Sequence, residues 1–266
     1  ALAGRTMTYA SGYYDYWLVK TNSEGVFQWN KTYGGGGQDA AGSLIQTGDG
    51  GFALAGYVDW PGDAMVVKTD VNGAVEWSKQ YGSADLEVGG SLDRRREGGY
   101  ALAIQSGTKL LFLELNLHGS IQSQAWYPTP QQFVKVSGGV VVQTDDGGYV
   151  IAGSAEISSY PYDSDFYLLK ISGKDTDQDG LFDLWEQQGI DVNNDGNLEL
   201  DLKALGANWQ YKDLFVEVDY MEFHKPNASA INDVKAAFKN APVLNPNGTS
   251  GINLHVIVDN EIAHLD

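Results

Sequence analysis

The sequence Gln46-Thr-Gly-Asp-Gly-Gly-Phe-Ala-Leu-Ala-Gly56 places a glycine pair before an aromatic residue and a short apolar run. The pattern returns at Gly98-Gly-Tyr-Ala-Leu-Ala-Ile104 and at Gly147-Gly-Tyr-Val-Ile-Ala-Gly153, so the glycine pairs are 48 and 49 residues apart. Self-similarity at a fixed period of about 20–50 residues is the signature of repeat architectures. This period therefore decides the fold of the amino-terminal two thirds of the chain.

Each repeat contains four short segments with the composition of β-strands. After the apolar run comes a second strand, a glycine turn, a third strand with tryptophan or tyrosine, and a fourth that ends in Gln-Thr-x-Asp. The second strand of the repeat recurs at 16–20, 64–68, 110–114 and 166–170. Four strands in such a period predict a β-propeller blade. A β-solenoid is the alternative, although its coils are usually shorter and contain less tryptophan.

Two further features of the repeats carry predictions. The tryptophan and tyrosine residues are expected to pack between blades rather than to bind a ligand. In the middle repeat, Arg94-Arg-Arg-Glu97 replaces Gln-Thr-x-Asp, which indicates either a contact private to that turn or simple drift.

The number of strands does not complete a propeller. Ala1-Leu-Ala-Gly4 matches Ala53-Leu-Ala-Gly56, so the chain opens on the second strand of a blade. About fourteen strands precede Gly173, or about three and a half blades, whereas propellers close with about four to eight. Open sheet edges invite pairing. We expect either upstream blades or copies of the same chain, paired through these edges, to complete the sheet.

The segment 175–201 carries nine acidic residues and no basic one. Its first acids and Gly180 fall at positions 1, 3, 5, 6, 9 and 12 counted from Asp175, which is the spacing of an EF-hand-type calcium loop. Calcium takes six to eight oxygen ligands, and the glycine permits the sharp turn. The predicted ligands are Asp175, Asp177, Asp179, the carbonyl of Leu181, Asp183 and Glu186.

A second acidic run begins in the same way, but its closing acid falls at position 11. The predicted ligands of this variant loop are Asp191, Asn193, Asp195, Asn197, Glu199 and Asp201. We expect two Ca²⁺ sites, the first the stronger. A solvated acidic linker is the alternative, and Mg²⁺ is disfavoured because it tolerates crowded carboxylate cages poorly.

The pattern changes again near the end of the chain. A short helix over 181–188 ends at Gly189, and a strand follows at 214–220. Ser229 is expected to cap a helix with one apolar stripe, and a second strand covers 252–258. Strand, helix and strand predict a parallel βαβ unit, which is too small to cover a sheet alone.

The sequence thus predicts a multi-domain chain. Residues 1–173 form incomplete all-β propeller-like repeats, residues 174–203 an EF-hand-like or thrombospondin-type calcium-binding linker, and residues 204–266 a partial α/β domain.

Composition excludes several classes of function. The net charge of −18 argues against nucleic acid and anionic membrane surfaces as partners. No apolar run approaches the roughly 18–20 residues that span a bilayer. The absence of cysteine excludes thiol catalysis, disulfides and cysteine-ligated zinc. Asn260-Glu-Ile-Ala-His264 lacks the first histidine of a His-Glu-x-x-His helix, so no catalytic residue is assigned.

Two resemblances agree with this division. Trp17-Leu-Val-Lys-Thr21 with Gln46-Thr-Gly-Asp-Gly-Gly-Phe52 resembles the repeats of archaeal and bacterial exported surface proteins. That resemblance covers residues 1–171 and implies a propeller-like fold displayed outside the cell. Residues 175–266, with Asp175-Thr-Asp-Gln-Asp-Gly180 and Lys212-Asp-Leu-Phe-Val-Glu-Val-Asp219, are similar to the opening of exported zinc-metallopeptidase-like proteins. Their zinc-binding helix lies further downstream than this chain extends.

The leading hypothesis is a non-catalytic, exported, calcium-binding protein of surface assembly or adhesion. One alternative is the amino-terminal portion of a secreted zinc metallopeptidase, and a second is a carbohydrate-binding propeller. A secreted or cell-surface location is expected because weak calcium modules are typical of extracellular proteins. No signal peptide is visible, which indicates a mature or trimmed form. Three weak glycosylation sequons fit the same location, at Asn30, Asn227 and Asn247.

Overall fold

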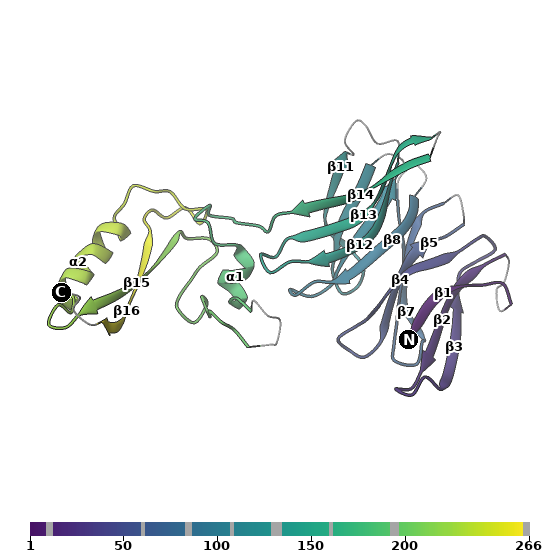
Figure 1. The fold of residues 1–266 in the computed structure, drawn as a ribbon, viewed down its shortest axis with the longest axis horizontal. Coiled ribbons are helices and arrows are strands. Elements are labelled where there is room, and N and C mark those ends of the chain that lie inside the picture. The colour runs from purple at the N-terminus through teal and green to yellow at the C-terminus, as the bar shows by residue number, and fades with distance from the viewer. Residues whose placement is uncertain are drawn as a thin grey trace. The chain divides into compact units, whose positions relative to one another are not determined.

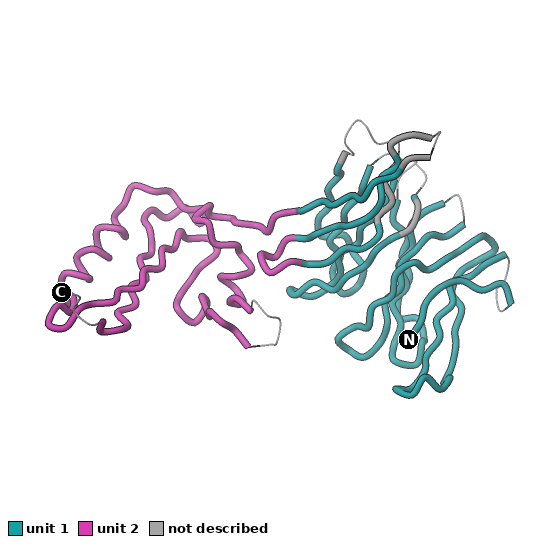
Figure 2. The backbone as a smooth tube through the Cα atoms, viewed as in Figure 1, with its two compact units in different colours: residues 1–143, 149–170 teal, residues 144–148, 171–266 magenta. Residues whose placement is uncertain are grey.

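The computed structural model describes residues 1–8, 13–59, 62–82, 87–106, 109–128, 135–159, 162–191 and 197–262. The chain divides into two compact units (Figure 2). Unit 1 comprises residues 1–143 and 149–170, and unit 2 comprises residues 144–148 and 171–266.

Unit 1 is built from β-strands in four small sheets (Figure 1). The strand orders are β1-β2-β3, β4-β5-β6-β7, β8-β9-β10-β11 and β12-β13-β14. The strands are β1 (Leu2–Thr6), β2 (Asp15–Thr21), β3 (Phe27–Tyr33), β4 (Ala40–Gln46), β5 (Phe52–Tyr57), β6 (Ala64–Thr69), β7 (Val75–Tyr81), β8 (Glu87–Arg94), β9 (Tyr100–Ser106), β10 (Lys109–Leu115), β11 (Ile121–Pro128), β12 (Lys135–Gln143), β13 (Tyr149–Ser159) and β14 (Tyr162–Ile171). This is the propeller-like, mostly antiparallel β architecture that the repeats predict. Of the described strands, three lie in the first sheet and three in the last.

The glycine pair has a structural reason in each repeat. The first glycine has a left-handed backbone, with φ of 85° at Gly50, 92° at Gly98 and 76° at Gly147. A side chain disfavours this conformation. The second glycine lies against a strand, since a Cβ on Gly51 would be 2.1 Å from the carbonyl oxygen of Thr69. A Cβ on Gly99 would likewise be 2.0 Å from the carbonyl oxygen of Leu115. The pair therefore turns the hairpin and lets two backbones meet closely.

The sheets pack on one another through apolar side chains. Tyr16 and Leu18 of β2 lie in one buried cluster with Phe52 and Leu54 of β5. A second buried cluster joins the second sheet to the third. The buried tyrosines also tie neighbouring repeats together, because the Tyr33 hydroxyl donates to the Gly73 carbonyl at 2.9 Å. Tyr16 and Tyr33 thus pack between repeats, as predicted.

The arginine-containing turn makes contacts of its own. In the second sheet Lys68 is buried and pairs with Asp49 at 2.8 Å. In the third sheet Glu114 occupies the position of Lys68, and its cation is Arg95, which lies 3.4 Å away at the position of Thr47 in the turn. Arg95 also donates to the hydroxyl of Tyr149 at 3.2 Å. The departure from the repeat is therefore a substituted ion pair rather than drift.

Unit 2 contains α1 (Asp183–Gln188), β15 (Asp213–Met221), α2 (Ala228–Lys239) and β16 (Asn253–Ile262). Strands β15 and β16 pair in parallel, as a strand-helix-strand unit requires. An apolar groove of about 330 Å³ lies along them, lined by Val216, Val234 and Val256 among others. The two strands and the helix thus leave apolar surface uncovered. Neither helix in the described part of the chain is long and apolar enough to cross a bilayer.

Two predicted details of the helices are wrong. The helix predicted from 181 begins at Asp183, because Phe182 still has an extended backbone. Its end at Gly189, with φ of 82°, agrees with the prediction. The cap of α2 is Asn227 rather than Ser229, since the Asn227 side chain accepts the backbone N–H of Ser229 at 2.8 Å. Asn227 is the residue that directly precedes the helix with extended backbone angles.

Candidate metal centre

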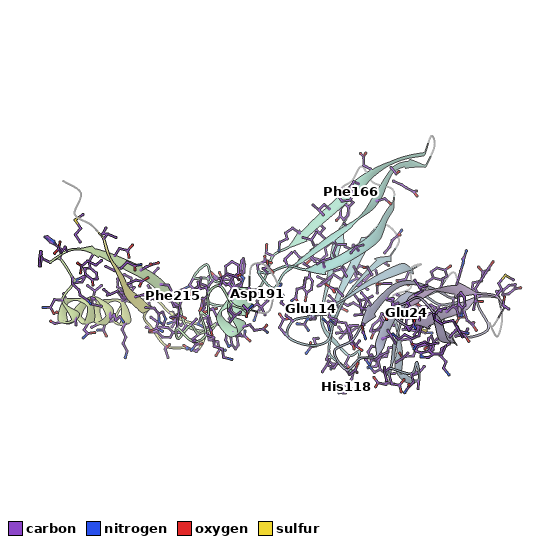
Figure 3. The ribbon with its side chains drawn as sticks, turned by 60° about the horizontal axis from the view of Figure 1, so that its bottom comes forward. Glu24, Glu114, His118, Phe166, Asp191 and Phe215 are labelled. Atoms are coloured by element: carbon purple, nitrogen blue, oxygen red, sulfur yellow. The ribbon has the colours of Figure 1, made fainter. Side chains whose placement is uncertain are left out.

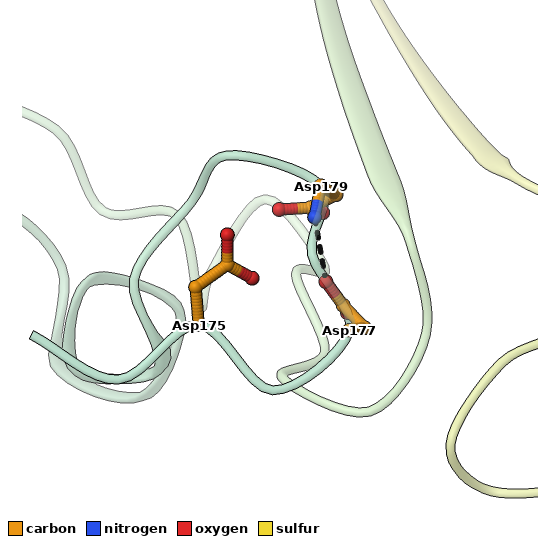
Figure 4. A group of neighbouring side chains, drawn as sticks. All are labelled: Asp175, Asp177 and Asp179. Carbon is orange, nitrogen blue, oxygen red and sulfur yellow. Dashed lines mark hydrogen bonds between the residues drawn. The ribbon is translucent and has the colours of Figure 1, made fainter.

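The loop that begins at Asp175 curls around its own carboxylate (Figure 4). Asp175 accepts hydrogen bonds from the backbone N–H groups of Gln178 at 2.7 Å and Gly180 at 3.1 Å. Gln178 and Gly180 have φ of 61° and 98°. The glycine at position 6 thus provides the turn that a calcium loop needs.

Three carboxylates of the loop converge. Asp175, Asp177 and Asp179 each place an oxygen within 4.8 Å of the others. Asp177 also accepts from the backbone N–H of Asp179 at 3.2 Å, and Asp179 accepts from that of Leu181 at 2.7 Å. The alternation of acids in the sequence therefore brings alternate side chains to one side of the loop.

A second group shares Asp179 with the first. Asp179, Glu186 and Asp213 also lie with oxygens within 4.8 Å of one another. Glu186 comes from α1 and Asp213 from the start of β15. The two groups together gather five carboxylates from the loop, the helix and the strand. These clustered acidic residues can hold a metal ion.

Glu186 is the unusual member of this cluster. It is 2% exposed, and neither carboxylate oxygen has a hydrogen-bond partner. Asp177 is also buried, with its Oδ2 atom unpartnered. A buried carboxylate without a partner is strongly unfavourable in its charged form. A bound cation or a proton is therefore needed to neutralise the negative charge of the cluster.

The pKa values of these carboxyl groups agree with this requirement for neutralisation. Burial, reinforced by the charges of Asp177, Asp179 and Asp213, raises the pKa of Glu186 to about 8. Burial and the neighbouring Asp179 raise the pKa of Asp177 to about 6. Burial also raises the pKa of Asp179. With no cation bound, the cluster holds protons near neutral pH.

Asp213 is the member that sequence reasoning missed. Its side chain is fully buried and accepts from the backbone N–H of Asn208 at 2.7 Å, the side chain of Asn253 at 2.8 Å, and His255 at 2.6 Å. His255 in turn stacks on Phe215, with ring centroids 4.2 Å apart. An aspartate as the first residue of an apolar strand is the signal that could have pointed to it.

Two predicted ligands of the first loop have other described contacts. Asp183 is in neither carboxylate group, and it accepts from the backbone N–H and the hydroxyl of Thr176, both at 2.7 Å. Lys174 lies 3.3 Å from the same carboxylate. Asp183 thus stabilises the start of the loop through these contacts. For Leu181 the described hydrogen bond uses its N–H rather than its carbonyl.

The second run is described only in part. Asn193 and Asp195 lie outside the described residues. Ile190 and Leu200 form a bridge that brings the ends of the run together, and Asp201 accepts the backbone N–H of Ala204 at 2.8 Å. Among the acidic residues that the structure describes in this run, Asp191, Glu199 and Asp201 belong to no carboxylate group of metal-binding geometry. A second calcium site stays a prediction.

The sequon asparagines occupy three different settings. Asn30 lies in β3. Asn227 caps α2, and Asn247 accepts from the backbone N–H of Thr249 at 3.0 Å in an exposed turn. Their glycosylation stays a prediction.

Comparison with known proteins identifies no relative by sequence: no family model and no curated protein matches the chain. Among solved structures, a protein of unknown function from Bacteroides caccae is 13% identical with a TM-score of 0.37. A xylan β-1,4-xylosidase from Bacillus halodurans is 15% identical with a TM-score of 0.37, and an exo-1,5-α-L-arabinanase from a bovine ruminal metagenomic library is 11% identical with a TM-score of 0.38.

The matches cover 60%, 60% and 62% of this chain, and 59%, 36% and 68% of the respective structures. The chain thus spans less than two thirds of the first two structures. At these scores the similarities carry no conclusion about activity.

Proposed function

We propose that residues 175–186 together with Asp213 bind one Ca²⁺ ion, and that the protein is a non-catalytic, exported protein of surface assembly. The observation that carries the calcium proposal is the buried Glu186 carboxylate, which has no hydrogen-bond partner and lies among other carboxylates. A divalent cation at this point would replace the missing partners of Glu186 and Asp177.

The donor set favours calcium over other divalent cations. All five clustered side chains are carboxylates, and hard oxygen ligands suit Ca²⁺ and Mg²⁺ rather than zinc. Ca²⁺ accepts six to eight oxygens in an irregular cage, whereas Mg²⁺ requires near-octahedral geometry and keeps several waters. Glu186 stands at position 12 of the loop, where a calcium loop supplies both oxygens of one carboxylate.

The proposed role of the ion is to stabilise unit 2. Asp175, Asp177 and Asp179 belong to the loop, Glu186 to α1 and Asp213 to β15, so one ion would join three segments. Without the ion, repulsion between these carboxylates opposes the fold. Calcium concentrations outside the cell are sufficient for weak sites of this kind, which supports the exported location.

The test is calcium titration of the full chain by calorimetry, with thermal unfolding in calcium and in chelator. A ligand at 100 times its dissociation constant stabilises the folded state by about 2.7 kcal/mol. We expect calcium to raise the unfolding temperature of the wild type. Glu186→Gln should lose most of this shift, whereas Glu217→Gln, at an exposed glutamate on β15, should keep it. A wild-type chain that binds no calcium at millimolar concentration would overturn the proposal.

A further inference from the structure

The sheets of unit 1 follow one packing rule. The strands β2, β6 and β10 are equivalent, and each directs alternate residues at the sheet that follows. Tyr16 and Leu18 pack with Leu54 of the second sheet. Ala64 and Val66, their equivalents in β6, pack with the third sheet in the same way.

The third sheet obeys the same rule toward the fourth. Leu110 and Phe112 of β10 are buried, and the rings of Phe112 and Tyr149 lie 4.7 Å apart. The six side chains at these two positions in β2, β6 and β10 are at most 4% exposed. Each is covered by the strand that follows a glycine pair.

The fourth sheet breaks the rule. Phe166 and Leu168 of β14 occupy these two positions and are 74% and 61% exposed (Phe166 is labelled in Figure 3). Val140 and Val142 of β12 are also at least half exposed. Val140 pairs with Ala152, as its equivalent Ser43 pairs with Ala55 in the second sheet. We call Val140, Val142, Phe166 and Leu168 the β14 face.

The first sheet has the complementary surface. Leu2 is equivalent by sequence to Leu54 and Leu102, which are both fully buried against the preceding sheet. Leu2 itself is 66% exposed. We call the side of the first sheet that carries Leu2 and Val19 the β1 face. Val19 is equivalent to Val67, which is also buried.

We propose that the β14 face of one chain packs on the β1 face of a second copy, head to tail. Both surfaces are open in this chain, and the contact that would join them is the one already made between its consecutive sheets. An extended apolar face of this kind marks an interaction surface on a soluble protein.

Closure sets the number of copies. A head-to-tail contact repeats until a ring closes, or else it grows into a filament. Four described sheets from each of two copies make eight, which lies within the range of about four to eight blades seen in closed propellers. The inferred assembly is therefore a two-copy ring with two equivalent contacts. It does not depend on the proposed calcium site.

The experiment measures the mass of the full chain in solution, by light scattering and by sedimentation, in calcium and in chelator. We expect twice the 28.8 kDa mass of one chain at high protein concentration. Leu168→Glu and Leu2→Glu should each shift the chain to the mass of a single copy. Leu117→Glu is the matched control, because Leu117 lies in a turn and is 61% exposed, as Leu168 is. This control should leave the assembly intact.

Mixing the two variants tests the head-to-tail geometry. Leu168→Glu retains an intact β1 face and Leu2→Glu retains an intact β14 face, so an equimolar mixture should form pairs through one contact. Unchanged circular dichroism of each variant shows that the fold survives. A wild type that remains a single copy at every concentration overturns the proposal. A mixture that fails to associate also overturns it. Self-association of one variant on its own would indicate a face-to-face contact and would overturn the head-to-tail geometry.

Discussion

The backbone N–H of Asp213 donates to the Oδ2 atom of Asp179 at 2.7 Å, which joins two residues 34 positions apart. The acidic loop and the first strand of the α/β part are therefore in direct contact. Lys212 reinforces the junction, because its ammonium group donates to the backbone carbonyl of Asp177. The proposed metal centre thus extends beyond the loop that suggested it.

Replacing Asp213 should weaken calcium binding. Asp213→Asn keeps the size of the side chain but removes one negative charge from the cluster. Loss of supporting groups around a metal typically costs about 10–100-fold in affinity, and we expect at least the lower figure here by calorimetric titration. Asp219→Asn, at an exposed position on the same strand, should bind calcium as the wild type does. Equal affinities for the two variants would remove Asp213 from the site.

The calcium-free protein should lose stability as pH rises. The pKa of Glu186 is about 8 when folded against an ordinary value of 4.5, so the folded state holds the extra proton between these values. Stability falls with pH wherever the folded state binds more protons than the unfolded state. The contribution from Glu186 is therefore complete below pH 4.5 and is lost as pH rises through 8.

Urea unfolding of calcium-stripped protein across this pH range measures the effect. Glu186→Gln should show a shallower decline than the wild type, because the titrating group is gone. Calcium should reverse the trend in the wild type, since the ion binds deprotonated ligands. A wild type and a variant with parallel pH profiles would contradict the assigned acidity.

Gly147→Ala should destabilise the chain more than Gly50→Ala. Both glycines have the same left-handed conformation in equivalent turns, and a side chain there costs about 1–2 kcal/mol. A Cβ on Gly50 would meet nothing within 4 Å, whereas a Cβ on Gly147 would lie 2.9 Å from that of Leu184 in α1. Overpacking adds about 1–3 kcal/mol. Urea unfolding should resolve this difference, and equal losses would show that α1 does not pack on the turn.

The Arg95–Glu114 ion pair in the third sheet should be energetically coupled. Arg95→Thr restores the common repeat residue but leaves the half-buried Glu114 without its cation, which should cost about 1–3 kcal/mol. Adding Glu114→Lys supplies a lysine opposite Glu97, as Lys68 stands opposite Asp49 in the second sheet. The double variant should recover part of the loss. A double-mutant cycle from urea unfolding measures the coupling, and simple additivity would contradict it.

The repeats could be predicted from the sequence because their signals are local. The glycine pair encodes both a left-handed turn and a close backbone contact, so its recurrence marks one hairpin in each of the second, third and fourth sheets. The repeats also help to interpret the β14 face. Leu168 is exposed, whereas Leu18 and Val66 at the equivalent positions are buried, and only this comparison shows that its exposure is unusual.

The remainder of the candidate site required long-range information. Asp213 enters the cluster through the fold of unit 2, and no spacing in the sequence relates it to Glu186. The cap of α2 fails for a different reason, because Asn227 and Ser229 are both good capping residues. The backbone at the helix start decides between them.

The Asp49–Lys68 and Arg95–Glu114 pairs differ in which side supplies the cation, the strand or the turn. This difference affects how similar repeats avoid mispairing while the chain folds. A turn from the second sheet placed beside β10 would bring Thr47 in place of Arg95, so Glu114 would face Asp49 without its cation. That error would bring two like charges together. The different ion pairs thus distinguish the two neighbouring hairpins and disfavour this mispaired intermediate.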